Sequence, residues 1–296
     1  MIPYVKAFDP EYGVCRRVSP RIRRVVANNP GPFTFTGTGT YIVGNGTVAV
    51  VDPGPDDGAH LKALLAAVEG ETVSHVLVTH THRDHAPLAR PFADAVGALV
   101  LAARPPARET HASGGLDEAE DQDFRPDVIL KDGDRIAGPD WTLETLATPG
   151  HASNHLAFAL IEENALLSGD HVMGWATSGV APPDGDMGAY MDSLERVTAR
   201  GFKTLWPTHG APVTDVAPFL TAYRTHRLER EAQILARLEA GDRTIGEMVP
   251  ALYAAVDQRL WPAASLSVLA HLIDLVRRRV VVCDGEPELG SMFRPA

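Results

Sequence analysis

The sequence predicts a layered α/β domain followed by a smaller helical domain. Between residues 22 and 168, short strand-like runs alternate with helical runs, and turns rich in Gly and Pro separate them. After Pro212 the chain changes to long helical segments. This alternation is typical of α/β proteins, and 296 residues with 45% hydrophobic content suffice for one substantial domain and a small one. We place the first domain in residues 1–216 and the second in residues 217–296.

The elements of the first domain follow from local patterns. Strands are expected at residues 22–27, 40–43 and 47–51, with Gly44-Asn45-Gly46 as a hairpin turn between the last two. The following elements are a helix at 59–68, a strand at 73–78, a helix at 88–96 and a strand at 98–101. Residues 104–127 predict an exposed loop or insertion, residues 128–168 predict further short strands, and residues 175–190 predict a loop.

The second domain is expected to contain helices at residues 218–238, 245–255 and 263–279, followed by a strand at 280–283. Thr244 and Glu247 form a capping box at the start of the middle helix. The order of helices and strand indicates a winged-helix unit. Such units often bind DNA, but ten basic residues are balanced by ten acidic ones here. Arg277, Arg278 and Arg279 in a last helical turn complement the helix dipole, so we expect no duplex DNA binding.

The most informative motif is Thr79-His80-Thr81-His82-Arg83-Asp84-His85, directly after the strand at residues 73–78. In an extended chain His80 and His82 point to one side, and Asp84 and His85 lie on the turn that follows. Three further candidates follow short apolar runs that end in turns: His151, Asp170 and His209. A single histidine of this kind is more often a surface or core residue, but the whole pattern indicates a metal site.

These motifs resemble the metallo-β-lactamase superfamily, and the resemblance extends from about residue 21 to residue 282. It implies an αβ/βα metallo-β-lactamase sandwich with the site at one rim. It also implies that one metal is bound by His80, His82 and His151, that the other is bound by Asp84, His85 and His209, and that Asp170 bridges them. The motif lacks the Glu-for-His change at its second position that marks the oxygen-reducing diiron relatives, so a redox enzyme is disfavoured.

The resemblance narrows to the LACTB2-like branch, which has a C-terminal winged-helix domain. The segments that carry it are residues 223–231 and residues 37–41. It implies a dinuclear metal hydrolase that cleaves an ester, thioester or lactone, or an endoribonuclease that acts on single-stranded RNA. A metal-stabilised regulator that binds nucleic acid is a third hypothesis. The C-terminal helices argue against a hydroxyacylglutathione hydrolase, and the chain has no room for the inserted domain of the more elaborate ribonucleases.

The implied mechanism uses a hydroxide bridged by two metals, so no Ser or Cys nucleophile is required. Asp84 and Asp170 are the expected catalytic residues. Imidazole and carboxylate ligands favour zinc, with iron or manganese as alternatives. Two other histidines, His155 and His171, are candidates to orient the metal ligands. The loop at residues 175–190 suggests that Asp186, Met187 and Tyr190 line the pocket.

Composition excludes several classes of protein. No apolar stretch approaches the roughly 20 residues of a membrane span, and the first residues lack the pattern of a signal peptide. We therefore expect a cytoplasmic protein without membrane contact. Cys15 and Cys283 are expected to be free thiols. The net charge of −11 disfavours loose binding to polyanions, although two metal ions would reverse the local field. The oligomeric state stays open.

Overall fold

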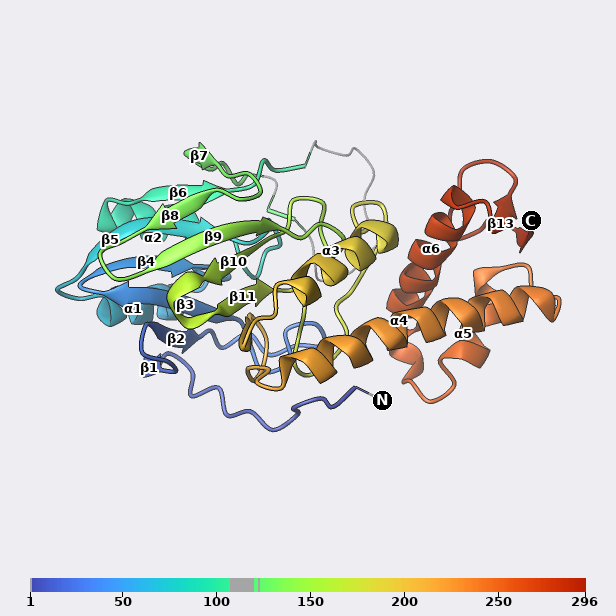
Figure 1. Cartoon of the computed structure of the whole chain (residues 1–296), viewed down its shortest axis with the longest axis horizontal. Coiled ribbons are helices and arrows are strands. Elements are labelled where there is room, and N and C mark those ends of the chain that lie inside the picture. The colour runs from blue at the N-terminus through green and yellow to red at the C-terminus, as the bar shows by residue number, and fades with distance from the viewer. Residues whose placement is uncertain (1, 107–119, 122) are drawn as a thin grey trace.

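Two β-sheets face each other in the first domain, and helices cover the outer face of each (Figure 1). The computed structural model describes residues 2–106, 120–121 and 123–296. The first sheet has the order β1 (Arg16–Arg17), β2 (Ile22–Val26), β3 (Gly39–Asn45), β4 (Thr47–Val51), β5 (Thr72–Val78), β6 (Leu99–Ala102) and β7 (Val128–Ile129). The second has the order β12 (Thr204–Pro207), β11 (Ala165–Gly169), β10 (Leu156–Leu160), β9 (Thr142–Ala147) and β8 (Arg135–Ala137).

The central strands are apolar on both faces because both faces are covered. In β5, Leu77 points between the sheets, where it joins a core that includes Phe158 of β10. Its neighbours Val76 and Val78 point the other way, into the core beneath the helices. Alternation of side chains along a strand places successive residues in these two cores. Strands buried on both faces therefore show continuous Val and Leu runs instead of alternating polar residues.

Four helices complete the layers. The first sheet is covered by α1 (Gly58–Ala67) and α2 (Ala89–Val96), and the second by α3 (Met187–Ala199) and the first half of α4 (Val216–Glu239). A short 3-10 helix, η1 (Ile161–Glu163), joins β10 to β11. Helices on both outer faces of two packed sheets make an αβ/βα sandwich, as the resemblance implied.

The C-terminal domain has its own core. It comprises the second half of α4, α5 (Ile245–Leu252), η2 (Gln258–Leu260), α6 (Trp261–Arg277) and the two-stranded sheet of β13 (Val281–Cys283) and β14 (Phe293–Pro295). The capping box is present, since the Thr244 side chain accepts from Glu247 and the Glu247 side chain accepts from Thr244. Helices followed by a small antiparallel sheet form the winged-helix arrangement. The predicted fold class is therefore confirmed for both parts of the chain.

Several local predictions also have a structural outcome. The hairpin turn between β3 and β4 is present, with Gly46 at a φ of 72°. Cys15 and Cys283 are free. The predicted loop at residues 175–190 is wrong at its end, because α3 begins at Met187 with Asp186 as its capping residue. Most of the expected acidic insertion, residues 107–119 and 122, lies outside the described residues.

The expectation that no apolar stretch approaches the length of a membrane span is wrong, because residues 258–277 are long and apolar enough to cross a membrane by length and composition alone. The buried side chains of this segment, among them Val268, Leu272 and Leu275, form the core of the C-terminal domain. This packing accounts for its apolar character. At the end of the same helix, Arg277 pairs with Asp186, and Arg278 pairs with acidic residues of α4 and α6. These ion pairs are consistent with the absence of duplex DNA binding, which stays a prediction.

Candidate metal centre

All seven predicted ligands lie at one rim of the sandwich. The motif from His80 to His85 follows β5, His151 follows β9, Asp170 follows β11 and His209 follows β12. Each side chain is delivered by the turn after a strand, and these strand ends meet at the same edge. The structure thus brings together residues that are as far apart in sequence as position 80 and position 209. Their role as metal ligands remains a prediction.

His80, His82 and His151 form the first group. The Nδ1 atom of His82 lies 2.9 Å from Nε2 of His80 and 3.2 Å from Nε2 of His151. Two nitrogens bound to one tetrahedral zinc ion lie roughly 3.3 Å apart, given Zn–N bonds of about 2.0–2.1 Å. Burial and neighbouring imidazoles lower the pKa of His82 to about 3, so the ring stays neutral and keeps its lone pair. The spacing and the charge state both suit a metal ion.

Asp84, His85 and His209 form the second group. Oδ2 of Asp84 lies 3.3 Å from Nε2 of His85 and 3.1 Å from Nε2 of His209. The Asp84 side chain is 20% exposed, whereas those of His85 and His209 are almost fully buried. The centre therefore opens to solvent on the Asp84 side.

Asp170 lies between the two groups. Its Oδ2 atom is 3.3 Å from Nε2 of His209, 3.6 Å from Nε2 of His85 and 3.9 Å from Nε2 of His151. Its other oxygen, Oδ1, is buried and accepts no hydrogen bond from the described residues, and Nε2 of His85 is buried beside the Asp84 and Asp170 carboxylates but makes no hydrogen bond of good geometry to the described residues. Buried polar atoms of native proteins are nearly always satisfied. A metal ion on each side would satisfy these atoms, so the residues fit a dinuclear site.

The outer ring nitrogens of the histidines are held by oxygen atoms. Nδ1 of His151 lies 2.7 Å from the Gly179 carbonyl oxygen, and Nδ1 of His209 lies 3.1 Å from that of Gly37. A carbonyl oxygen only accepts, so each Nδ1 carries the proton and donates it. Nε2 of each ring then faces the centre, and in the neutral ring its lone pair is directed at the place of a metal ion, as metal-binding histidines require.

Asp52 is a residue of the centre that the sequence motifs do not predict. It follows β4, is 1% exposed, and its carboxylate accepts from the backbone N–H and the hydroxyl of Thr79 at 2.7 and 2.8 Å. Its Oδ2 also accepts from Nδ1 of His85 at 2.9 Å. Asp52 therefore orients His85 and ties the loop after β4 to the loop after β5. The sequence feature that indicates such a role is Asp52-Pro53-Gly54, a turn that directly follows β4.

Two glycines directly precede predicted ligands in the sequence, in Gly150-His151 and Gly169-Asp170, and the backbone conformation explains both. Gly150 has a φ of 137°, and a Cβ there would lie 2.3 Å from the backbone of Tyr190. Gly169 has a φ of 52°, and a Cβ there would lie 2.6 Å from Nε2 of His155. Each glycine lets the next residue, His151 or Asp170, enter the centre where a larger residue would clash.

The two candidate orienting histidines differ. Nε2 of His155 accepts from the backbone N–H of Asp170 at 3.1 Å, while its Nδ1 lies 2.8 Å from the Thr148 hydroxyl. His155 thus fixes the backbone of Asp170, and its role in orienting a metal ligand stays a prediction. The His171 ring packs 5.0 Å from the ring of Tyr190, and neither ring nitrogen makes a hydrogen bond to the described residues, whereas its backbone carbonyl accepts from Tyr190 and Ser178. It does not orient a ligand through its imidazole.

The carboxylates of the centre attract positive charge. Burial opposes protonation of His85, but Asp84, Asp170 and Asp52 outweigh burial and raise its pKa well above the ordinary value. Burial also opposes protonation of His209, yet Asp170 and Asp84 raise its pKa to about 10. In the metal-free protein, protons on His85 and His209 thus balance the negative charge of carboxylates that a divalent cation would otherwise neutralise. Metal binding should release these protons.

The residues expected to line the pocket are placed differently. Met187 and Tyr190 belong to the hydrophobic core beneath α3, and Asp186 caps α3 and pairs with Arg277. The reason is the helix that starts at Met187, which turns these side chains inward. Instead, the half-buried rings of Phe35 and Trp175 stack 4.7 Å apart beside Gly210, the residue after His209.

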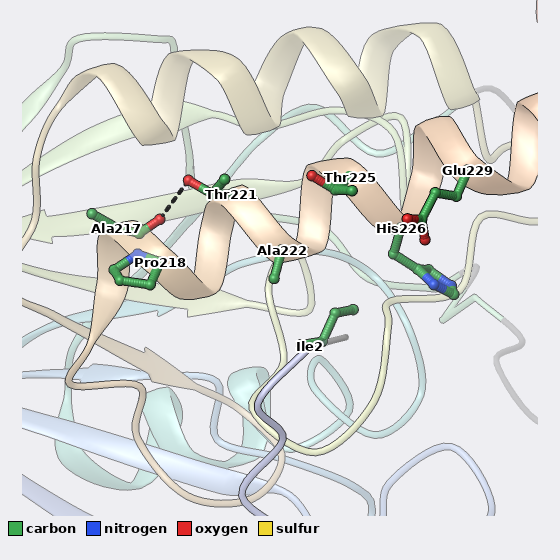
Figure 2. Close-up of a pocket in the computed structure, with 8 residues that line it drawn as sticks. All are labelled: Ile2, Ala217, Pro218, Thr221, Ala222, Thr225, His226 and Glu229. Atoms are coloured by element: carbon green, nitrogen blue, oxygen red, sulfur yellow. Dashed lines mark hydrogen bonds between the residues drawn. The ribbon is translucent and has the colours of Figure 1, made fainter.

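A groove of about 500 Å³ lies elsewhere, between α4 and the N-terminal segment (Figure 2). Figure 2 shows Ile2 facing Ala222 and His226 of α4 across it. Its lining contains none of the seven predicted ligands. The groove is therefore not the place of metal chemistry.

We expect the purified protein to contain two transition-metal ions per chain and to lose thermal stability when they are removed. A ligand at a thousand-fold excess over its Kd stabilises the folded state by about 4 kcal/mol. For a domain of this size that corresponds to a Tm increase of roughly 10 °C. Elemental analysis of protein purified without chelator, followed by thermal melts before and after chelation, measures both. Fully active protein without metal would contradict the assignment.

The sandwich and the two His/Asp groups at its rim define a metal-dependent hydrolase. The chain belongs to the metallo-beta-lactamase superfamily, whose family model matches residues 34–209. Residues 244–289 match the beta-lactamase associated winged helix domain. The predicted superfamily and C-terminal domain type are thus confirmed, while membership of the LACTB2-like branch stays a prediction.

Curated relatives match most of the chain. Lactamase-like protein adaB from Aspergillus niger is 29% identical over 320 residues, which cover 99% of this chain and 95% of that protein. An atrochrysone carboxyl ACP thioesterase from Aspergillus chevalieri is 31% identical over 255 residues, which cover 82% of this chain and 76% of that protein. The thioesterase of the same name from Claviceps purpurea is 31% identical and covers 77% of this chain and 69% of that protein.

Solved structures share the fold. A beta-lactamase domain protein from Burkholderia ambifaria has a TM-score of 0.79 and 21% identity, with 100% of this chain and 97% of that chain covered. A metallo-beta-lactamase family protein from Thermus thermophilus has a TM-score of 0.75 and 24% identity, with 95% and 100% covered. Both matches extend through the C-terminal domain, so the combination of sandwich and winged helix is shared as well.

Proposed function

We propose that this chain is a dinuclear metal-dependent thioesterase whose substrates are acyl groups carried by an acyl carrier protein. The observation that carries the hydrolase part is the pair of His/Asp groups that share Asp170 at the rim. Relatives at about 30% identity, named as ACP thioesterases, support the thioester. The alternative of single-strand endoribonuclease action gains no support from these names, and the net charge of −11 does not favour it.

The ligand chemistry supports zinc as the metal, because the set contains only imidazole and carboxylate groups. Iron and manganese are the alternatives, since such ligands do not select strictly. Divalent ions bound here would supply a lowered pKa for water and polarise an acyl carbonyl group.

The surroundings of the centre favour a leaving group that needs no proton. A thiolate leaves at neutral pH because the pKa of a thiol is about 8.5, whereas an alkoxide or an amine requires a proton donor. Among the described residues, no Lys, Tyr or Cys side chain makes a hydrogen bond to the seven predicted ligands. Neighbouring imidazolium groups of His85 and His209 keep the pKa of Asp84 well below its ordinary value despite burial. Asp84 therefore stays ionised, and it can accept a hydrogen bond from an attacking water molecule and so orient it.

Two stacked aromatic rings lie near the open side of the centre. Thr38 donates to Asp84 at 3.3 Å, which fixes the loop before β3 at the opening. Phe35 of this loop has a φ of 55°, a costly conformation for a bulky residue, and its ring stacks on Trp175. Strained residues of this kind cluster at ligand sites. We therefore assign the Phe35 and Trp175 rings to contact with the acyl group.

We expect Trp175→Ala to raise KM for a long acyl thioester about tenfold, with kcat within about threefold of the native value. Loss of a buried apolar contact of roughly 1.5–3 kcal/mol accounts for this change. The same variant with an acetyl thioester is the control, because a two-carbon acyl group does not reach the rings. An equal increase of KM for both substrates would contradict an acyl-binding role.

The function itself is tested with protein that has been stripped of metal and then reconstituted with zinc, iron or manganese. Initial rates are compared for an acyl-CoA thioester, the same acyl group on an acyl carrier protein, the corresponding oxygen ester, a lactone, a chromogenic β-lactam and single-stranded RNA. We expect kcat/KM to be highest for the carrier-protein thioester and at least about tenfold lower for the oxygen ester. Higher kcat/KM with RNA or with the β-lactam would refute the proposal.

A further inference from the structure

The loop between Asp170 and α3 makes a hydrogen bond to one of the predicted metal ligands, His151. Gly179 lies in this loop, and its carbonyl oxygen accepts the Nδ1 proton of His151 at 2.7 Å. The position of that carbonyl therefore sets the rotation of the His151 ring, and with it the direction of the Nε2 lone pair. A ligand whose ring rotates by a small angle loses metal affinity, as replacement of such orienting partners usually shows.

Two residues of helix α4, Tyr223 and Arg227, make hydrogen bonds to the backbone of this loop. The hydroxyl oxygen of Tyr223 accepts from the backbone N–H of Ser178 at 2.8 Å and donates to the carbonyl of Ala176 at 2.9 Å. Tyr223 is completely buried. Since Ser178 directly precedes Gly179, these bonds fix the chain immediately before the carbonyl that orients His151.

Arg227, one turn further along α4, contacts the same peptide. Its guanidinium donates to the carbonyl of Ser178 and lies 4.9 Å from the centre of the Tyr190 ring. The residue is 4% exposed, and no carboxylate among the described residues forms an ion pair with it. Burying a guanidinium without a carboxylate is costly, which favours a specific role over general packing.

We propose that Tyr223 and Arg227 are positioning residues that set the metal affinity of the His80, His82 and His151 group through the Ser178–Gly179 peptide. The same helix continues into the core of the C-terminal domain, where Ile234 and Leu238 are buried. Helix α4 runs from the sandwich into the C-terminal domain (Figure 1), so the residues that hold the Ser178–Gly179 peptide and those in the C-terminal core lie on one helix. The inference rests on the proposed metal site and does not depend on which substrate the enzyme hydrolyses.

The test is the stepwise binding of Zn²⁺ or Co²⁺ to metal-free protein, measured by competition with a chromophoric chelator and by the Co²⁺ absorption spectrum. We expect Arg227→Met to weaken one of the two binding steps by about 10–100-fold and to leave the other within about threefold. The step affected is the one assigned to the histidine group, because the loop orients His151 and neither His85 nor Asp84. Tyr223→Phe, which loses only the hydroxyl, should change the same step.

Two further variants distinguish positioning from general destabilisation. Arg224→Met removes an exposed cation three residues earlier on α4 and should bind both ions as the native chain does. Arg227→Lys retains a donor for the Ser178 carbonyl and should restore part of the lost affinity. Unchanged affinity in Arg227→Met, or an equal loss at both steps that follows the fall in Tm, would overturn the inference. Native protein that binds no metal would instead refute the proposed centre itself.

Discussion

Replacement of Asp170 by alanine is expected to abolish hydrolysis and to weaken metal binding at both sites. Asp170 is the only predicted ligand assigned to both ions, and its Oδ2 lies within 3.9 Å of ligand nitrogens from the two groups. Its removal takes away one of the carboxylates that face His85 and His209, and the one that lies between the two groups. A loss of about 4 kcal/mol of transition-state stabilisation corresponds to a fall in kcat on the order of 10³-fold. Initial rates and elemental analysis of the same preparation measure both effects.

His75→Ala is the matched control. His75 lies earlier on β5, is half-buried, and its Nδ1 contacts only the neighbouring Ser74 hydroxyl at 3.0 Å. Metal content and kcat of this variant should stay within about twofold of the native values. If the two variants lose metal equally, the assigned ligands are not the metal site.

Much of the centre could be predicted from sequence because the motifs are local. The run from His80 to His85 contains four of the seven ligands within six residues, and alternation along an extended chain already places two of them side by side. The three remote ligands each follow a strand that ends in a turn. Their convergence depends on the order of the strands in the two sheets, which only the family resemblance supplied.

The parts that were missed depend on contacts between distant segments. In the sequence, Asp52 resembles an ordinary turn residue. Only the pairing of β4 with β5 in the folded chain brings His85 Nδ1 to 2.9 Å from its carboxylate. The start of α3 was assigned to a loop because Pro182, Pro183 and Gly185 precede it closely. The helix is nevertheless stabilised by Asp186 at its N-terminus and by burial of Tyr190, and the second effect cannot be seen in local composition.

The role of α4 shows why a domain division by composition is incomplete. The predicted boundary at residues 216 and 217 falls at the first turn of this helix, and the division into residues 1–216 and 217–296 stays a prediction. The first half of α4 packs on the second sheet through Phe219 and Tyr223, and the second half packs on α5 and α6. A single helix is therefore part of two hydrophobic cores. Amino-acid composition changes at the start of α4, but the hydrophobic packing of the helix does not divide at that position.

Asp52→Ala is expected to produce the largest loss of stability of any single change at the centre. Alanine leaves the N–H and hydroxyl of Thr79 and Nδ1 of His85 without their acceptor in a fully buried place. Removing one partner from such a buried charged network costs about 3–5 kcal/mol. Asp52 also has a φ of 50°, which alanine tolerates poorly. We expect a fall in Tm of roughly 10 °C or more.

Asp52→Asn removes the negative charge of this side chain and keeps its size and shape, so it tests the two contributions separately. Asparagine adopts the left-handed conformation readily and can still accept from Thr79, so most of the stability should remain. It cannot supply the negative charge that orients and polarises His85, so metal affinity at the Asp84, His85 and His209 group should fall about 10–100-fold. Thermal melts and stepwise metal titrations separate the two effects, with the exposed Asp56→Ala as a neutral control. Native metal affinity in Asp52→Asn would show that the carboxylate only supports the fold and does not tune the metal centre.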